Sequence, residues 1–304
     1  MRIRDAHSHF FSLRLFELLA GQAAQSGGGR AEDLLERVTA SGVELPGPSP
    51  RLHARRWVEQ LDLHGVAHAV TFASHPAEAE AVAEGCAEAG GRLTPFVLVD
   101  PSTEAGLAAG RRALGDLGFR GILLFPALHR FDPSSPQLDP LYEDASARGA
   151  PIVVHCGLLQ IRLRDLLGIR PKYDLRAATP LAVSAAAERH PRARFIIPHF
   201  GCGYFREALL AGAQSPNVYL DTSSSNSWTS TQPDGLDLAA VFRRALEVFG
   251  PKRLLFGTDS STFPRGWRAD ILRDQRSILS TLAITASDQE RILGGNVAEI
   301  LELD

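Results

Sequence analysis

The chain has 304 residues and a formal net charge of -3 at pH 7, with 32 basic and 35 acidic side chains. This balance, without a dense basic block, argues against a nucleic-acid partner, because phosphate backbones are bound by clustered Lys and Arg. The three cysteines lie far apart and favour a reducing compartment over a disulfide framework. No apolar run approaches the roughly 20 residues that span a bilayer, and no leader pattern opens the chain. We therefore expect a cytoplasmic protein that does not contact membranes.

Short apolar stretches recur along the chain and predict buried strands. Each is almost continuously Val, Ile, Leu or Phe, which is typical of strands covered on both faces of a parallel sheet. These stretches are 2–7, 67–73, 93–99, 121–125, 151–155, 194–199, 217–222 and 253–258.

Helices are expected between these strands, and three of them carry terminal signals. Residues 76–90 begin with a proline and end in glycines, as a helix does. Thr179 precedes a proline and is the expected N-cap of the helix over 179–191. Near the end of the chain, Ser287 and Glu290 have the spacing of a capping box.

The alternation of strands and helices predicts a (β/α)8 TIM barrel that forms a single domain over 1–304. This length is ordinary for one barrel, which takes about 250 residues plus insertions. A doubly wound open sheet is disfavoured because no Gly-rich dinucleotide turn follows the first strand. Connections as long as the one after that strand are uncommon unless functional. We interpret 10–50 as an insertion that caps the barrel mouth, with a flexible decoration as the alternative.

Four histidines and an aspartate fall at the carboxyl ends of predicted strands, where barrel enzymes place their catalytic residues. His7 and His9 end the first strand, His155 the fifth and His199 the sixth, and Asp259 follows the eighth. Because positions 7 and 9 are two apart, both side chains point the same way in extended backbone. Neutral imidazoles with one carboxylate are typical of a catalytic rather than a structural metal site. The pattern therefore predicts a catalytic site for a divalent transition metal.

Several motifs resemble the amidohydrolase superfamily, in the right order from Asp5 to about Leu301: "DAHSH", "VVHCG", "RFIIPHFGCG", "RLLFGTDS" and "ILGGNVAEIL". They are most similar to its branch named after aminocarboxymuconate-semialdehyde decarboxylase, also called amidohydrolase 2. The resemblance implies one bound metal, usually Zn2+, although Mn2+, Fe2+ or Co2+ suit the same donors. It also makes a homodimer plausible.

By this resemblance, the metal ligands are His7, His9, His155 and Asp259. His199 is implied to be a nearby catalytic histidine. As a hypothesis for hydrolysis, Asp259 would also carry a proton to the leaving group. In binuclear relatives a carboxylated lysine ends the fourth strand and bridges two metals. Here Leu123 and Leu124 stand in that strand, so the resemblance favours one metal.

The reaction stays open between three hypotheses. The first is hydrolysis of an ester, lactone or amide in a small, carboxylated molecule by metal-activated water, with His199 polarising the carbonyl or managing the proton. The second is non-oxidative decarboxylation of a muconic or aromatic acid at the same residues. Several decarboxylating relatives carry an acidic residue in the first motif, whereas this chain keeps both histidines. The third, a barrel retained only for binding, is disfavoured because all five site positions are filled.

Other residues near the strand ends are candidates for substrate contact or support. Arg162 and Arg164 follow the fifth strand and would hold a substrate carboxylate by bidentate hydrogen bonds, unless they form a solvated face. Asp5 shares the inward face with the first two histidines. It would either orient a ligand histidine from behind or form a hydrogen bond at the strand edge.

Three aromatic residues lie in the loops that follow strands. Trp228, Phe10 and Phe11 are each a candidate pocket wall or a part of the loop core. Cys156 follows a candidate ligand, but the alternation of an extended chain turns it away from His155, so we expect a packed thiol.

Overall fold

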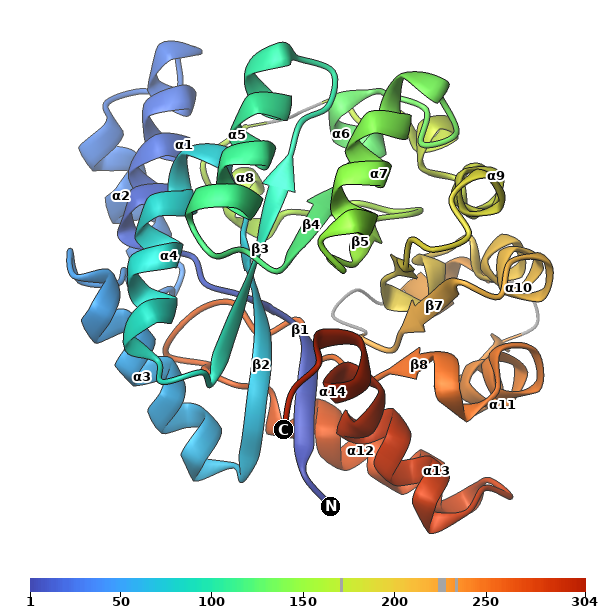
Figure 1. Ribbon diagram of the computed structural model, residues 1–304. Coiled ribbons are helices and arrows are strands. Elements are labelled where there is room, and N and C mark those ends of the chain that lie inside the picture. Colours follow the sequence, from blue (N-terminus) through green and yellow to red (C-terminus); the bar gives the residue numbers. More distant parts are fainter. Residues whose placement is uncertain (170–171, 224–227, 233–234) are drawn as a thin grey trace.

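Eight parallel strands in chain order, β1 to β8, form a nearly closed barrel with helices around it (Figure 1). The computed structural model describes residues 1–169, 172–223, 228–232 and 235–304. The strands are β1 Ile3–His9, β2 Val66–Ala73, β3 Leu93–Val99, β4 Gly121–Leu124, β5 Ile152–Val154, β6 Phe195–Ile197, β7 Val218–Asp221 and β8 Leu254–Leu255. The predicted TIM barrel is confirmed.

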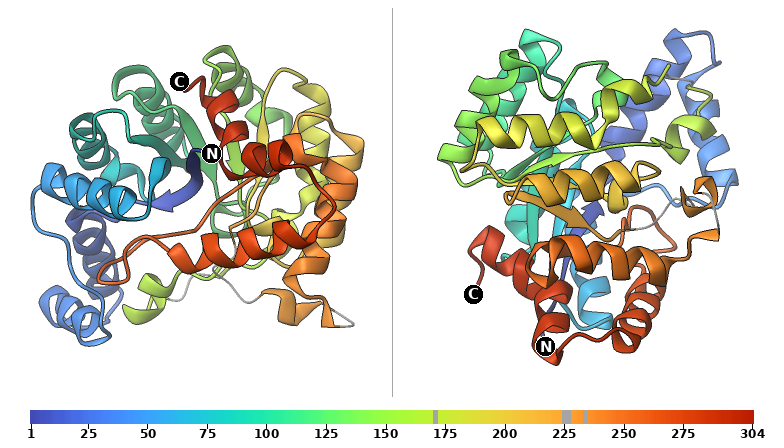
Figure 2. Two further views of the ribbon diagram at one scale, coloured as in Figure 1. Left: turned by 90° about the horizontal axis from the view of Figure 1, so that it is seen from below. Right: turned by 90° about the vertical axis from the view of Figure 1, so that its right-hand side faces the viewer.

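Hydrogen bonds between β1 and the chain that follows β8 bring the two edges of the sheet together. The amide of Ala6 donates to the carbonyl of Phe256 at 2.7 Å, and the amide of Asp259 donates to the carbonyl of His7 at 2.8 Å. The termini also meet, because Arg4 donates to the main-chain carbonyl of Asp304 at 2.7 Å. The N- and C-termini accordingly lie near each other in both views of Figure 2.

The continuous apolar runs of the sequence correspond to strands that are buried on both sides. Every residue of β3, β4, β5 and β6 is buried. Such strands contact other strand side chains inside the barrel and helices outside it. The later strands end earlier than predicted, so that His155 and His199 follow β5 and β6 instead of ending them. Cys156 is fully buried, as expected of a packed thiol.

The helices surround the barrel (Figure 2). The α-helices are α1 Leu13–Gln25, α2 Ala31–Ala40, α3 Pro50–Leu63, α4 Ala79–Glu88, α5 Glu104–Asp116, α6 Pro126–His129, α7 Asp139–Ala147, α8 Arg162–Leu166, α9 Pro180–Arg189, α10 Phe205–Gln214, α11 Leu238–Phe249, α12 Ala269–Thr281, α13 Ala286–Glu290 and α14 Asn296–Leu301. Short 3-10 turns are η1 Pro76–Glu78, η2 Pro136–Leu138, η3 Leu175–Ala178, η4 His199–Gly201, η5 Trp228–Thr231 and η7 Pro251–Arg253, and η8 Arg291–Gly295 is a π-helical turn. None of the described helices is long and apolar enough to cross a membrane.

The structure confirms the start predicted for two helices and contradicts the capping box predicted for a third. Thr179 is the N-cap of α9, as predicted. The predicted capping box of Ser287 and Glu290 is wrong. The box is formed by Thr285 and Asp288, because α13 begins at Ala286 and Ser287 already lies in its first turn. The proline-led segment 76–90 forms η1 and α4, as expected.

The long connection between β1 and β2 contains α1, α2 and α3. Helices α1 and α2 share a hydrophobic cluster of their own, which includes Phe16, Leu34 and Val38. Leu163 of α8 and Leu167, which directly follows α8, belong to the same cluster. The segment 10–50 therefore packs against the chain that follows β5. That it acts as a cap stays a prediction.

A buried carboxylate, Glu78 in η1, fixes the start of this connection to the end of β2. One of its oxygens accepts hydrogen bonds from the amide of Ser12 at 2.6 Å and from the Ser12 hydroxyl at 2.8 Å. The other oxygen accepts from the amide of Ser74 at 2.9 Å. Burial raises the pKa of Glu78 to about 7, although these hydrogen bonds act in the opposite direction.

Replacing Glu78 should change how the stability of the protein depends on pH. Because the pKa of Glu78 in the folded chain lies above its usual value of 4.5, the native state binds the proton more tightly than the unfolded state does. Its contribution to the free energy of unfolding is complete below about pH 4.5 and is lost as the pH rises through about 7. The unfolding free energy of wild type minus that of Glu78→Gln should therefore fall, by on the order of 2 kcal/mol, between pH 5 and pH 8.

Urea denaturation over this pH range at constant metal content measures that difference. Glu80→Gln is the matched control, since Glu80 is exposed on α4 and paired with Arg112. It should leave the pH dependence unchanged. A wild-type to Glu78→Gln difference that is constant with pH would contradict the role given to Glu78.

Candidate metal centre

A cavity of about 450 Å3 opens where the carboxyl ends of the strands meet. This volume lies in the range of pockets that bind small molecules. All five side chains predicted for the site line the cavity: His7, His9, His155, His199 and Asp259. Much of the remaining wall is apolar and includes Phe11, Leu15, Leu19, Phe125 and Leu159.

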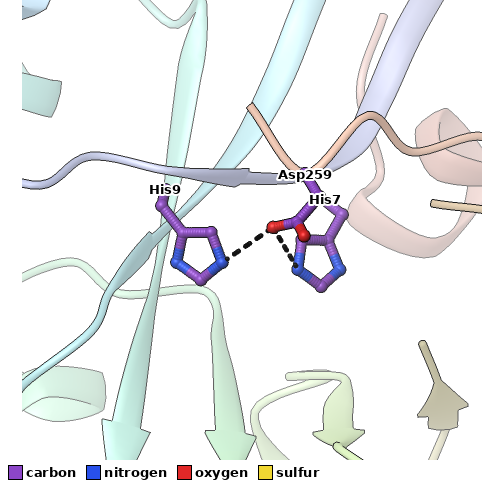
Figure 3. A group of neighbouring side chains, drawn as sticks. All are labelled: His7, His9 and Asp259. Atoms are coloured by element: carbon purple, nitrogen blue, oxygen red, sulfur yellow. Dashed lines mark ion pairs between the residues drawn. The ribbon is translucent and has the colours of Figure 1, made fainter. Parts of the chain in front are cut away.

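His7, His9 and Asp259 converge on one point of this cavity (Figure 3). Oδ1 of Asp259 lies 3.1 Å from Nε2 of His9 and 3.6 Å from Nε2 of His7. Each of the three offers one donor atom, and these atoms lie within 4.8 Å of one another. The structure therefore brings these three predicted residues together, and their role as metal ligands stays a prediction.

The backbone explains why these residues meet. The alternation along β1 directs both histidines to the same side. The hydrogen bond between the Asp259 amide and the His7 carbonyl brings the chain after β8 alongside β1. Asp259 and His199 each have a φ of 56°, in the left-handed region. Such backbone costs about 1–3 kcal/mol per residue and is concentrated at functional sites. Here it turns the chain sharply at the two strand ends.

Asp221, the last residue of β7, is a buried carboxylate behind the cavity that the sequence analysis did not identify. Its Oδ2 lies 2.6 Å from Nδ1 of His7, and its Oδ1 accepts the Ser223 amide at 2.6 Å and the Ser223 hydroxyl. That hydroxyl lies 2.8 Å from Nδ1 of His199. Although burial opposes its ionisation, the charge and hydrogen bond of His7 hold the pKa of Asp221 below its usual value. The sequence offered one signal for Asp221, which is that it lies near the end of the predicted strand 217–222.

These contacts determine which nitrogen of each ring carries the proton. An ionised carboxylate only accepts, so Nδ1 of His7 donates to Asp221. Nδ1 of His199 lies 3.0 Å from the carbonyl of Ser223, which also only accepts. In the neutral form of each ring, the lone pair is therefore on Nε2. His7, His199 and Asp221 form a second compact group, but hydrogen bonds already join its members, and Asp221 is not among the described residues that line the cavity.

His155 lines the same cavity but lies outside the compact group of His7, His9 and Asp259. Its ring centre is 5.1 Å from that of His199. Nδ1 of His155 is buried and has no hydrogen-bond partner among the residues that the structure describes. Leaving a buried polar atom unpaired costs about 1–3 kcal/mol, so the lone pair of this nitrogen fits a metal ligand.

The protonation states of three of the four histidines in the cavity, and of Asp259, also fit a cation. His7 differs: burial lowers its pKa, but the charge and hydrogen bond of Asp221 outweigh this and raise it, so a metal would have to displace a proton there. Burial lowers the pKa of His9 and His199, and burial together with the charge of His199 lowers the pKa of His155 well below its usual value. Burial acts against ionisation of Asp259, but its hydrogen bond with His9 and the charge of His7 hold the pKa of this carboxyl well below its usual range. Neutral imidazoles and an ionised carboxylate are the forms that bind a divalent metal.

Only some of the residues predicted to bind substrate line the cavity. Arg162 and Arg164 line the cavity, and so does Phe11. Phe10 is fully buried against His53 with a ring-centre distance of 4.9 Å. The chain leaves the extended conformation just after β1, where Phe11 has a φ of 44°, and Phe11 lines the cavity while Phe10 lies in the core. The prediction that Phe10 contacts substrate is therefore wrong.

Trp228 was also predicted as a pocket wall, and this too is wrong. Its side chain is buried, and its ring centre lies 5.9 Å from that of Phe205 and 6.4 Å from that of Phe200. It is absent from the described residues that line the cavity. The loop uses this aromatic side chain for packing, which was the alternative open from the sequence.

Asp5 is fully buried, and it contacts main-chain amides and the side chains of Thr258 and Trp267 rather than a histidine ring. Its carboxylate accepts from the His7 amide at 2.9 Å, the Thr258 amide at 3.1 Å and Nε1 of Trp267 at 2.8 Å. Burial raises its pKa to about 6. The alternative of a hydrogen bond at the strand edge describes these contacts, while Asp221 holds the ring of His7.

Comparison with known proteins identifies the family. A family model described as amidohydrolase matches residues 5–303. The chain belongs to the amidohydrolase family. No protein of curated function is similar enough in sequence to match it. The amidohydrolase family is metal-dependent, so this chain is an enzyme of a metal-dependent family whose residues fit a metal site.

Solved structures share the fold at low sequence identity. A 5-carboxyvanillate decarboxylase from Novosphingobium aromaticivorans with bound manganese is 13% identical, with a TM-score of 0.66 over 99% of this chain and 97% of that chain. A protein assigned as a 2-pyrone-4,6-dicarboxylic acid hydrolase from Pseudomonas putida is 17% identical, with a TM-score of 0.60 over 99% and 97%. An uncharacterized TIM-barrel protein from Bordetella bronchiseptica is 18% identical, with a TM-score of 0.64 over 99% of both chains.

Asp221→Asn should weaken metal binding by about 10–100-fold, the usual cost of losing the hydrogen-bond partner of a metal-ligating histidine. An amide at this position presents one donor group where the carboxylate presents two acceptor oxygens, so either His7 or Ser223 loses its partner. Competition with a chelator measures the affinity. Asp274→Asn, at an exposed position on α12, is the control and should bind metal as wild type does. Equal affinities of wild type and Asp221→Asn would show that Asp221 does not support the site.

Proposed function

We propose that this amidohydrolase hydrolyses an ester, lactone or amide bond in a small, carboxylated molecule, with one divalent metal held by His7, His9, His155 and Asp259. Zinc is the first candidate for a set of histidines and one carboxylate, and manganese, iron and cobalt suit the same donors. Bound there, the cation would polarise a substrate oxygen and lower the pKa of water to about 7.

The observation that carries this proposal is the state of His199. Its ring is buried, its centre lies 4.7 Å from that of His7, and its Nδ1 is engaged by the carbonyl of Ser223. Burial lowers its pKa, so at neutral pH the ring presents an unprotonated Nε2. His199 is therefore suited to accept a proton, and not to donate a hydrogen bond that polarises a carbonyl.

Hydrolysis needs two proton transfers, one from the attacking water and one to the leaving group. His199 and Asp259 both line the cavity, and both are in the accepting form at neutral pH. Either group takes the proton from water and then returns it to the departing oxygen or nitrogen. Decarboxylation instead requires an acid that protonates carbon, so the neutral and ionised forms of these residues favour hydrolysis.

Decarboxylation of a muconic or aromatic acid is the second candidate. The fold shared with a 5-carboxyvanillate decarboxylase supports it, since that enzyme acts on an aromatic acid. The fold shared with the protein assigned as a 2-pyrone-4,6-dicarboxylic acid hydrolase supports hydrolysis in the same way. We also predict that the protein forms a homodimer and lies in the cytoplasm.

His199→Ala should lower turnover by about 10²–10⁴-fold, the usual contribution of a general acid–base group. The metal content should stay near that of wild type, because His199 is not one of the proposed ligands. Elemental analysis and steady-state assays with a panel of esters and lactones measure the two quantities. His64→Ala, at the end of α3, is the control and should change neither. Loss of the metal from His199→Ala would make His199 a ligand and overturn the assignment.

Product analysis separates the two reactions. The metal-loaded protein is incubated with a panel of lactones and with a panel of aromatic and muconic acids. We expect ring-opened lactones that have gained one water and no release of carbon dioxide. Carbon dioxide released from an acid in amounts equal to the acid consumed, without lactone hydrolysis, would replace the first candidate by the second.

A further inference from the structure

His9 differs from His7 and His199 in the group that its Nδ1 contacts. Nδ1 of His9 lies 2.7 Å from the hydroxyl oxygen of Ser74. Nδ1 of His7 instead contacts the Asp221 carboxylate, and Nδ1 of His199 contacts a main-chain carbonyl. A carboxylate and a carbonyl only accept hydrogen bonds, whereas a hydroxyl either accepts or donates. The contact with Ser74 therefore does not decide by itself which nitrogen of His9 carries the proton.

The opposite nitrogen of His9 faces a carboxylate (Figure 3). Its Nε2 lies 3.1 Å from Oδ1 of Asp259, whose pKa is held well below its usual range. Burial lowers the pKa of His9, so the ring is neutral at neutral pH and carries one proton. Because an ionised carboxylate only accepts, this proton lies on Nε2 when no metal is bound. Nδ1 then has a lone pair, and the Ser74 hydroxyl donates to it.

Ligation of a metal requires the other arrangement of the ring. His9 is a proposed ligand through Nε2, and a ligating nitrogen must present a lone pair instead of a proton. The neutral ring then carries its proton on Nδ1, which donates to the hydroxyl oxygen of Ser74. The Nε2 proton passes to solvent and Nδ1 takes one up, so the charge of the ring does not change. One hydroxyl thus satisfies Nδ1 in both arrangements.

The surroundings of Ser74 allow its hydroxyl to turn while the oxygen keeps its place. The main-chain amide of Ser74 donates to Glu78 at 2.9 Å, which fixes the backbone beside His9. Among the described residues, the hydroxyl has no hydrogen-bond partner other than His9, and Ser74 lines the cavity. The rings of Phe11 and Phe72 lie against that of His9, at 5.0 and 5.4 Å between ring centres. The hydroxyl hydrogen is therefore free to turn from Nδ1 towards the cavity.

We propose that Ser74 is the positioning residue of His9, and that its hydroxyl changes from hydrogen-bond donor to acceptor when His9 ligates the metal. This inference rests on the ligand set of the proposed function and describes how one ligand becomes ready to bind. His7 and His199 have no such choice, because the groups that hold their Nδ1 atoms only accept.

Nitrogen-15 NMR of the histidine rings, recorded before and after the metal-free protein is loaded with Zn2+, tests this change of role. We expect the His9 proton on Nε2 in the metal-free protein and on Nδ1 in the loaded protein. His199 is the internal reference and should keep its proton on Nδ1 in both, and His9→Gln identifies the His9 signals. A proton already on Nδ1 of His9 in the metal-free protein would overturn the change of role. A proton that stays on Nε2 after loading would remove His9 from the ligand set, which is a failure of the proposed function instead.

Ser74→Ala and Ser74→Thr test the positioning role through metal affinity, measured by competition with a chelator. An imidazole that ligates a cation donates more strongly from Nδ1, so loss of the hydroxyl in Ser74→Ala should weaken Zn2+ binding by about tenfold. Ser74→Thr keeps the hydroxyl and should bind as wild type does. Ser280→Ala removes an exposed hydroxyl on α12 and is the matched control.

Two results would contradict the positioning role of Ser74. It fails if Ser74→Ala binds Zn2+ as tightly as wild type, or if Ser74→Thr loses as much affinity as Ser74→Ala, because the hydroxyl would then not be the group that matters. The proposed reaction is tested separately. A protein that gives the expected NMR and affinity results but hydrolyses no ester or lactone keeps the role of Ser74 and loses the reaction.

Discussion

The candidate site depends on one main-chain hydrogen bond, from the amide of Asp259 to the carbonyl of His7. It joins the first strand to the chain that follows the last one and places a carboxylate beside two imidazoles, and the bonds from Ala6 to Phe256 and from His9 to Ser260 close the barrel with it. Residues from opposite ends of the sequence thereby share one cavity. The cluster of His7, His9 and Asp259 needs an accurate closure, because a shift of one residue in an extended chain would turn each side chain to the other face.

A second layer of contacts behind that cluster determines its chemistry. The Asp221 carboxylate and the Ser223 carbonyl each accept a hydrogen bond from an Nδ1, so in the neutral form of His7 and of His199 the lone pair is on the opposite nitrogen. Burial then keeps His199 neutral. The function we propose follows from these protonation states more than from the identity of the residues, since the same side chains in other tautomers would neither bind a cation nor accept a proton.

The sequence was sufficient for the barrel and for the residues that converge, because both follow from local patterns. Apolar runs identify strands, and a fixed polarity of parallel strands brings their carboxyl ends together. It was insufficient for contacts that depend on loop geometry. Phe10 and Phe11 are adjacent, and only their orientation separates a core residue from a cavity wall. Arg265 lines the cavity from the loop between β8 and α12, and the path of this loop cannot be read from local pattern. Asp221 was overlooked although it ends a strand as the histidines do.

The branching of hydrogen bonds at Asp221 has a consequence for how this enzyme can change through mutation. One carboxylate supports His7 directly and His199 through Ser223, so these positions share a partner and their substitutions should not be independent. A change at Ser223 that is tolerated in one sequence background will be damaging in another, according to what stands at position 221. In divergent relatives we therefore expect these four positions to vary as a group.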